Sequence, residues 1–505
     1  MPFYGLGRRL KYSMANGALV SVAALVPAEH EVVLIDENVE RIDFDLLRRF
    51  DVIGLTGMVV QADRMLEILR KLRDQPGTIV VGGPFVSVSE QTFEGLCDAR
   101  FIGEAEETWP MFLNALAAGA PTFTRYQQDG KTDMTKVPVP RFDLLPRGRY
   151  GTAPVQFSRG CPFLCEFCDI ITIFGRRPRV KRPEQILAEL DAVLAQGFRG
   201  CFLVDDNFIG NKIEAKRLLP RIIEWQQQHG YPLEFVTEAS INLANDREFI
   251  DLMVLANFRT VFIGIETPRE ESLAETRKHQ NIHGDSLLTK LERIRSSGLG
   301  VSGGFIVGFD NDDESIFDEQ FEFIQSSGIA TLSISLLTPL PTTPLYDRLR
   351  AEGRLDFTDP ELIYIPKQMT REQLKTGFHK LLLRIFDVDA FFDRVFTGKL
   401  TLRSADPDHV RRNIAVNRRL VLWVAWSARA TMLALVMASK GELVRHFRAC
   451  RRILRRNSAL GAEGFTFGDM VGLWITYWHF ASVTKQISGT QFGNVPGNSA
   501  FIEKH

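Results

Sequence analysis

Runs of apolar residues separated by amphipathic stretches divide the first 120 residues into alternating strands and helices. The stretch Met65–Arg73 has the apolar spacing of a helix that buries one face. Strands that alternate with helices indicate a parallel sheet with right-handed crossovers, so we expect a doubly wound, Rossmann-like α/β domain. The runs that predict its buried strands are Val32–Ile35, Val52–Thr56, Thr78–Val81 and Arg100–Gly103.

A second alternating pattern begins near residue 150. Its helices fit between the apolar runs, as in Pro183–Gln196, where proline and Glu184 occupy the first turn and Gly197 follows the end. Six strand–helix repeats predict a partial or full barrel, whose working residues lie at the carboxyl ends of the strands. The candidate strands are Pro154–Ser158, Cys201–Asp205, Leu233–Glu238, Val261–Glu266, Val301–Val307 and Leu332–Leu336.

These patterns divide the chain into four parts. We expect an α/β domain over residues 1–120, a proline-containing linker over 121–150 and the barrel over 151–350. The strand pattern fades after about residue 350, so residues 351–505 are predicted to form a helical C-terminal domain.

Glycines follow three of the predicted strands in the first domain. The sequences at these points are Thr56-Gly57-Met58, Gly82-Gly83-Pro84 and Gly103-Glu104. Ligands of parallel sheets bind beyond the carboxyl ends of the strands, and glycine lets the backbone approach a large flat ligand. Because glycine also serves ordinary turns, this pattern alone leaves both interpretations open.

Three of the six cysteines lie within eight residues, directly after the first barrel strand. Cys161, Cys165 and Cys168 are spaced C-x3-C-x2-C, whereas Cys97, Cys201 and Cys450 are scattered. Three thiolates on one short loop can hold three irons of a [4Fe–4S] cluster and leave the fourth iron open. A structural zinc site needs a fourth ligand at matching spacing, and no nearby histidine or cysteine supplies one.

The composition is that of a globular protein, with 45% hydrophobic and 24% charged residues and a net charge of −1. A chain of this charge is not expected to bind nucleic acid. The charge is uneven, however, because residues 401–460 contain 13 Lys and Arg against three acids. This segment could face an anionic partner or form solvated helical faces.

An apolar stretch, Leu420–Ala438, lies inside the basic segment. It is long enough to span a bilayer, but Arg429 near its middle would cost about 2.5–3.5 kcal/mol on insertion. We therefore favour a buried or membrane-surface helix over a span. With no signal peptide pattern, and because a reducing compartment suits thiolate ligands, we expect a cytoplasmic protein with peripheral membrane contact through residues 401–460.

The cysteine motif, with Phe167 just before its last cysteine, resembles the signature of the radical S-adenosylmethionine superfamily. The resemblance implies that the open iron chelates S-adenosylmethionine and that an electron from the cluster cleaves it to a 5′-deoxyadenosyl radical. It also implies that the cofactor is bound at the strand ends of the barrel. The residues that match there are Phe167, Asp206, Asn207, Glu238, Ser240, Glu266, Gly304 and Gly308.

A doubly wound domain before such a barrel resembles the cobalamin-binding class of these enzymes. The class usually opens with a further strand before the helix at about Leu19, which this chain does not show. The family's histidine loop, D-x-H-x-x-G, is absent, and His30 precedes a predicted strand, so cobalt is expected to have no histidine ligand. The resemblance assigns cobalamin binding to Thr56, Gly57, Met58, Gln61, Gly82, Gly83, Pro84, Gly103 and Glu104.

The segment Ile365–Thr370 resembles a subgroup with an extra helical domain of unknown function, which includes hopanoid C-2 methylases. The resemblance implies methylation of an unactivated carbon: one S-adenosylmethionine supplies the methyl group through cobalamin, and another supplies the radical. A small-molecule or lipid substrate and an electron donor such as flavodoxin or ferredoxin are the implied partners.

Three other functions are weighed against methylation. A cobalamin radical enzyme that closes or rearranges a ring would carry the same motifs, and only product mass separates the two. Methylthio transfer needs a second cluster, which Cys97 alone cannot hold. A metal-stabilised binding module would leave two ligand-binding domains without a purpose.

Overall fold

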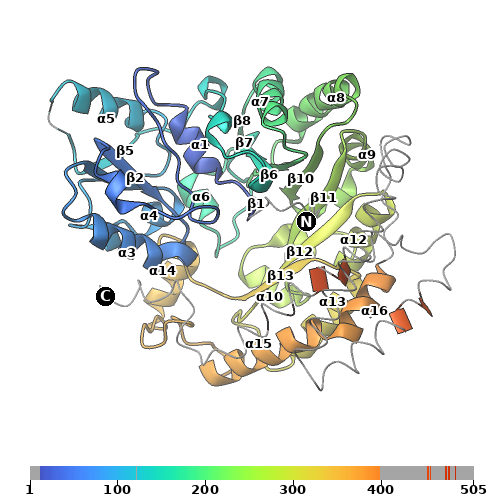
Figure 1. Cartoon of the computed structure of the whole chain (residues 1–505). Helices are drawn as coiled ribbons and strands as arrows, with labels where there is room; N and C mark the ends of the chain where they lie inside the picture. Colours follow the sequence, from blue (N-terminus) through green and yellow to red (C-terminus); the bar gives the residue numbers. More distant parts are fainter. Residues whose placement is uncertain are drawn as a thin grey trace, which may run out of the picture.

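The computed structural model describes residues 12–120, 122–398 and ten single positions between 452 and 484. Within these residues the chain forms a four-stranded sheet, a seven-stranded sheet and a short two-stranded hairpin (Figure 1). The predicted α/β fold, with an N-terminal Rossmann-like unit, a partial barrel and a helical region after it, is confirmed.

The smaller sheet is parallel and has the order β2-β3-β4-β5. Its last strand lies in the segment predicted as a linker, where Tyr126 stacks on Phe101 at a centroid distance of 4.8 Å. The strands are β2 (Val52–Thr56), β3 (Thr78–Gly82), β4 (Ala99–Ile102) and β5 (Arg125–Gln127), and the helices are α2 (Phe44–Leu47), α3 (Ala62–Leu72), α4 (Pro84–Val88) and α5 (Thr108–Ala117).

The larger sheet is also parallel, has the order β1-β6-β9-β10-β11-β12-β13 and curls into an open half-barrel covered by helices on its outer side (Figure 1). All six predicted barrel strands are present. Their bounds are β6 (Tyr150–Val155), β9 (Gly200–Leu203), β10 (Glu234–Ala239), β11 (Phe258–Glu266), β12 (Gly300–Val307) and β13 (Leu332–Leu336).

Helices between the strands follow from sequence signals of the kind seen in α7 (Pro183–Ala195). Pro183 occupies its first turn, and Ile186, Leu190 and Val193 form a fully buried stripe. The other barrel helices are α8 (Lys212–His229), α9 (Arg247–Leu255), α10 (Glu270–Glu275), α11 (His279–Ile282), α12 (Leu287–Ser296) and α13 (Ile316–Ser327), and α14 (Pro344–Ala351), α15 (Arg371–Ile385) and α16 (Val388–Thr397) follow.

The first described residues contact both sheets. A strand does precede the first helix, contrary to the sequence-based expectation, but β1 (Tyr12–Met14) pairs with β6 of the barrel. In α1 (Gly17–Ala23), Val20 joins the barrel core while Val22 packs on the core of the smaller sheet. Helix α1 therefore lies between the two sheets (Figure 1).

The predicted strand Val32–Ile35 was wrong, because these residues form no ladder. Leu34 packs against the barrel core and Ile35 against the core of the smaller sheet, while Val33 is exposed. The apolar run fills the junction between two cores, which gives it burial without hydrogen-bonded neighbours.

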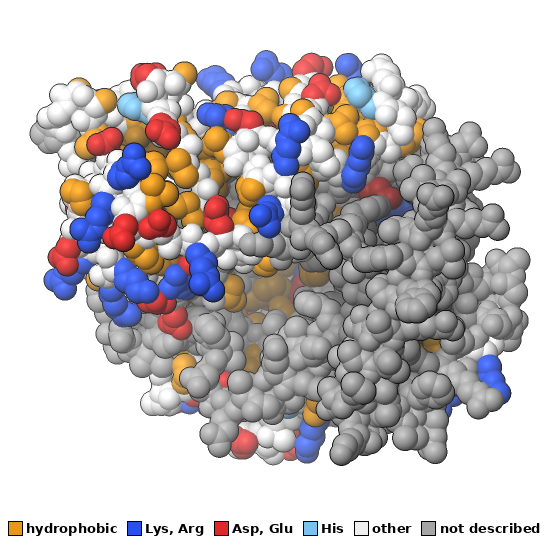
Figure 2. All heavy atoms as spheres, viewed as in Figure 1, with side chains coloured by type: hydrophobic (Ala, Val, Ile, Leu, Met, Phe, Trp, Pro, Cys, Tyr) orange, Lys and Arg blue, Asp and Glu red, His pale blue; other side chains and the backbone are white. Residues whose placement is uncertain are grey.

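On the described part of one face, Lys and Arg side chains are interspersed with Asp and Glu (Figure 2). No helix in the described ranges has the length and apolar character needed to cross a bilayer. The helix predicted over Leu420–Ala438, buried or at a membrane surface, and nearly all of the basic segment 401–460 lie outside the described residues.

Candidate functional site

The three clustered cysteines lie on the loop that β7 (Ser158–Arg159) and β8 (Arg179–Val180) close as an antiparallel hairpin. Gly160 has φ +101°, and a Cβ there would lie 2.9 Å from the carbonyl oxygen of Gly175, so only glycine fits. The next amide, that of Cys161, donates to the same carbonyl at 3.2 Å. The loop is thus fixed where the first cysteine begins.

The donor set fits an iron–sulfur cluster. All three thiols are free of disulfides, and the electrostatic interactions among them show that they lie close together. Burial raises the pKa of Cys161 and raises that of Cys168 to about 12, so the thiolate forms need the positive charge of bound iron. In the described part of the chain no three His, Cys, Asp or Glu side chains converge on a single metal ion.

Gln280 adds a polar contact to the second cysteine. Its Nε2 donates to Sγ of Cys165 at 3.5 Å. Hydrogen bonds to cluster sulfurs are among the protein's means of setting the reduction potential. Sequence reasoning missed Gln280, because nothing in a single glutamine 115 residues away marks it as a neighbour of the motif.

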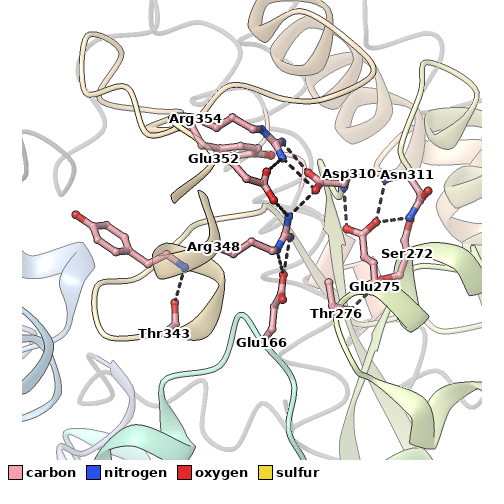
Figure 3. Close-up of polar contacts among 12 residues, drawn as sticks. Glu166, Ser272, Glu275, Thr276, Asp310, Asn311, Thr343, Arg348, Glu352 and Arg354 are labelled. Atoms are coloured by element: carbon pink, nitrogen blue, oxygen red, sulfur yellow. Dashed lines mark hydrogen bonds and ion pairs between the residues drawn. The ribbon is translucent and has the colours of Figure 1, made fainter. Parts of the chain in front are cut away.

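The outer side of the cysteine loop is held by α14 (Figure 3). The amide of Leu345 donates to the carbonyl of Glu166 at 2.9 Å, and Arg348 donates to the Glu166 carboxylate from Nε at 3.0 Å and from Nη2 at 2.5 Å. Arg348 Nη1 also reaches Asp310 Oδ2 at 2.6 Å, and Arg354 binds the same carboxylate. Burial raises the pKa of Asp310, but hydrogen bonds from the two arginines outweigh it and leave the pKa below its ordinary value.

Polar residues at the ends of β9 and β10 meet beside the loop. The amide of Gly160 donates to Asp206 Oδ2 at 2.7 Å, so Asp206 holds the first residues of the cysteine loop against the end of β9. Asn207 Nδ2 donates to Ser240 Oγ at 3.1 Å, which joins two of the predicted S-adenosylmethionine residues across neighbouring strands. Burial raises the pKa of Asp206 to about 6.

Glu238 is a free carboxylate on β10. It accepts no hydrogen bond from the described residues, and the register places it beside Phe262 on β11. Burial and the negative charges of Asp206 and Asp205 raise its pKa to about 7. A half-buried, unpaired carboxylate at a strand end is available to a ligand that carries hydroxyl, amino or cationic groups.

Glu266 takes an unusual backbone conformation at the end of β11, with φ +66° next to a register shift. Its carboxylate pairs with the buried amine of Lys278, and that amine lies 5.7 Å from the ring centroid of Phe167. A Cβ on Gly264 would lie 2.5 Å from the carboxylate, so glycine makes room for the pair. Lys278, which the sequence did not reveal, therefore contacts two predicted cofactor residues.

Gly304 and Gly308, which were predicted to contact S-adenosylmethionine, also make room for neighbouring side chains of the protein. A Cβ on Gly304 would lie 2.7 Å from the ring of Phe262. Gly308 has φ +107°, and its carbonyl accepts a hydrogen bond from the buried hydroxyl of Tyr364 at 2.7 Å. The segment after the barrel thus contacts the glycine-rich strand directly.

The predicted cobalamin residues come together at the carboxyl ends of β2, β3 and β4. Thr56 and Gly82 are register partners, and Gly83, which has φ +100° and no Cβ, leaves room for Thr56 Oγ1. Gln61 Oε1 accepts from the amide of Met58 at 2.9 Å, and the Met58 side chain is 60% exposed. The remaining members of this group are Gly57, Pro84 and Gly103, and a Cβ on Gly103 would meet open space.

Glu104 behaves differently from the other eight residues of that group. Its carboxylate is almost fully buried and accepts from Arg159, Arg179 and the amide of Thr132 at 2.9, 2.9 and 3.1 Å. These contacts occupy both carboxylate oxygens. The structure therefore gives Glu104 a place between the two sheets, where the barrel's arginines compete with any ligand.

Three family models match successive parts of the chain. The B12 binding domain matches residues 5–113, the radical SAM superfamily matches residues 155–324, and a domain of unknown function matches residues 343–491. The position of the three-cysteine loop, which follows the barrel strand β6, agrees with the match to the radical SAM superfamily.

Two curated relatives cover most of the chain. An uncharacterized methyltransferase of Synechocystis sp. is 43% identical over 76% of this chain and 73% of its own length. The hopanoid C-2 methylase of Rhodopseudomonas palustris is 35% identical over 75% of this chain and 73% of its own length.

A solved structure has the same arrangement of units. The cobalamin-dependent S-adenosylmethionine radical enzyme OxsB, with aqua-cobalamin and S-adenosylmethionine bound, superposes with a TM-score of 0.60 at 16% identity, covering 94% of this chain and 82% of that one. The matching models, the relatives and the shared fold lead to one conclusion: the chain belongs to the cobalamin-binding radical S-adenosylmethionine enzymes.

Proposed function

We propose that the protein transfers a methyl group to an unactivated carbon of a small-molecule or lipid substrate. The observation that carries this proposal is that the two proposed cofactor sites face each other. The ends of β2–β4 lie on one side of the buried Glu104–Arg159 ion pair, and the cysteine loop lies on the other. Eight predicted cobalamin residues lie at the ends of β2–β4, and the cysteine loop lies across Glu104 from them. The names of the two relatives support methyl transfer over ring closure.

Cys161, Cys165 and Cys168 would hold the cluster. When bound, the cluster and S-adenosylmethionine supply a carbon-centred radical, and cobalamin supplies the methyl group. The chain's own task is to bind and orient: Asp206 holds the cysteine loop, Asn207 and Ser240 are fixed against each other, and Glu238 presents a free carboxylate. Phe167, Glu266, Gly304 and Gly308 complete the S-adenosylmethionine side in this proposal.

Two parts of the proposal concern partners. Flavodoxin or ferredoxin would supply the electron that reduces the cluster. Residues 401–460 would contact anionic lipid headgroups through their excess of cations, which would bring the enzyme to a membrane-held substrate. The relationship to a hopanoid methylase supports a lipid among the possible substrates.

The test is anaerobic turnover with S-adenosylmethionine that carries a CD3 group. Reconstituted protein, a chemical reductant and a lipid extract from a hopanoid-producing bacterium would be incubated together and the products resolved by mass spectrometry. We expect a product that has gained an intact CD3 group, together with 5′-deoxyadenosine. A changed product that lacks the label would contradict methyl transfer and support a cyclase or rearrangement enzyme.

A further inference from the structure

Four charged side chains join the end of β4 to the hairpin that carries the cysteine loop. Arg159 Nη1 lies 2.9 Å from Glu104 Oε1 and 2.6 Å from Glu106 Oε1, and Arg179 Nη1 lies 2.9 Å from the same Glu104 oxygen. Thr132 adds two hydrogen bonds, from its amide to Glu104 and from its hydroxyl to Glu106. Two acids from one unit thus meet two arginines from the other.

The four side chains are largely withdrawn from water. Their exposed fractions are 1% for Glu104, 10% for Arg159, 13% for Glu106 and 17% for Arg179. The two positive and two negative charges balance. A guanidinium keeps its charge throughout the pH range in which proteins are folded, so both arginines meet the two acids as cations.

The ion pairs of the network lie only one or two residues along the chain from each of the two proposed cofactor sites. Arg159 and Arg179 face each other as register partners in the β7–β8 hairpin, and only Gly160 separates Arg159 from Cys161. On the other side, Glu104 directly follows Gly103, the strand-end glycine with open space beside it. A displacement of the network by one side chain would therefore move the cysteine loop relative to the ends of β2–β4.

A second contact holds the far end of the same loop. Ile173, in the short helix α6 (Ile170–Ile173) that follows Cys168, is part of the core of the smaller sheet, and Lys131 Nζ donates to its carbonyl at 2.5 Å. The cysteine loop is thus attached to the N-terminal unit on both sides. One attachment is apolar and adaptable, and the other is ionic and directional.

Stability alone does not explain an ionic network at this place. Replacing buried ion pairs by apolar residues of equal volume is often neutral or stabilising, because two desolvated charges repay their hydration only with good geometry. What arginine and carboxylate supply is direction, since a planar guanidinium fixes both the distance and the angle of its partners. A radical from one cofactor and a methyl group from the other have to reach the same substrate carbon, and this needs that kind of fixed geometry.

We propose that Glu104, Glu106, Arg159 and Arg179 form an interdomain clamp that fixes the separation and orientation of the cluster and cobalamin. Arg159 and Glu104 are its central positioning residues. The clamp rests on the cofactor placement in the proposed function but not on methyl transfer itself. It assigns Glu104 to the clamp in place of the ligand-binding role expected from the sequence.

The separation of the cofactors can be measured without a substrate. Reduced protein loaded with both groups holds one unpaired electron on cob(II)alamin and one on the cluster, and the cluster speeds the relaxation of the cobalt spin according to their distance. Pulsed electron paramagnetic resonance would be recorded for wild type, Arg159→Met, Arg159→Lys and Glu104→Gln. Arg125→Met is the matched control, because it removes an ion pair with Glu90 that lies inside the N-terminal unit.

We expect wild type and Arg125→Met to share one narrow relaxation component. Arg159→Met should lose that component and show a broad, slower distribution with iron and cobalamin contents unchanged. Arg159→Lys, which keeps the charge, should recover part of the narrow component. Glu104→Gln should give a result between those of Arg159→Met and Arg159→Lys. If Arg159→Met cannot be purified as folded protein, Glu104→Gln alone decides the question.

Wild-type relaxation in both Arg159→Met and Glu104→Gln would overturn the clamp. A second outcome would also overturn it: the variants lose iron or cobalamin, but the molecules that still hold both cofactors relax like wild type. The residues would then help to bind one cofactor and would not set the distance between the two. The proposed function fails separately, when the relaxation behaves as expected but no CD3 group reaches a product.

Discussion

At the scale of single residues, the Asp205 carboxylate ties the end of β9 to the start of the cysteine loop. It is 1% exposed and accepts hydrogen bonds from the amide of Phe157 at 2.7 Å and from Ser158 Oγ at 2.8 Å. Burial outweighs these hydrogen bonds and raises its pKa to about 7. The acid form is therefore favoured in the folded protein.

This pKa predicts how stability depends on pH. Since the folded pKa lies above that of the unfolded chain, the stabilisation by protonated Asp205 is complete below the unfolded value and is lost as pH rises to about 7. Asp205→Asn imitates the acid form at every pH. We expect the unfolding free energy of wild type, relative to that variant, to fall by about 2–4 kcal/mol between about pH 4 and pH 8.

Urea unfolding of the cluster-free protein at both pH values measures this difference. Asp45→Asn, at a side chain that is 97% exposed, is the control. A difference between wild type and Asp205→Asn that stays constant, or grows, with rising pH would contradict the assignment.

At the scale of elements, α14 braces the outer side of the cysteine loop through Arg348 (Figure 3). Arg348→Met would leave the Glu166 carboxylate, 6% exposed, without its cation and would remove one of the two arginines on Asp310. Stranding buried charges is costly, so we expect a loss of about 1–3 kcal/mol in unfolding free energy. Iron should also leave the loaded protein faster in the presence of a chelator.

Arg350→Met is the matched control for this prediction. Arg350 lies on the same helix, is 68% exposed and, among the residues that the structure describes, forms an ion pair only with the exposed Asp347. Exposed pairs contribute little, so this variant should unfold and release iron like wild type. Equal effects from the two substitutions would show that the helix, and not the Arg348 contact, determines the outcome.

The elements also show what could be predicted from the sequence. Buried parallel strands appear in the sequence as continuous apolar runs, so six of the seven strands of the barrel sheet were predicted and only the short edge strand β1 was missed. The C-x3-C-x2-C spacing predicted the loop proposed to hold the cluster. Contacts between distant segments left no such trace: Arg348 and Glu166 are 182 residues apart, and Arg159 and Glu104 are 55 apart. Val32–Ile35 failed because burial at a junction between two cores produces the same apolar run as burial in a sheet.

At the scale of the whole molecule, cobalt is expected to lack a histidine ligand. The sequence contains no histidine between His30 and His229, and His30 is exposed in a segment without regular structure. We expect cob(II)alamin in the protein to show a base-off spectrum without nitrogen hyperfine splitting.

Isotopic labelling makes the outcome specific to histidine. Electron paramagnetic resonance spectra of protein grown with ¹⁴N- and ¹⁵N-histidine should coincide, and His30→Ala should leave them unchanged. A nitrogen splitting that follows the label would reveal an imidazole ligand from another part of the chain and contradict the expectation.

Strand β1 gives the molecule an unusual topology. The described part of the chain begins at Tyr12 in the edge strand beside β6, leaves to form the smaller sheet and returns to the barrel at Tyr150. The cobalamin-binding sheet is therefore inserted between two strands of the barrel sheet, and it is connected to the barrel at β1 before it and at β6 after it. A simple one-point hinge cannot move it, because any opening has to bend two chain crossings together. The natural motion of such a unit is a small rotation about the line joining its anchors.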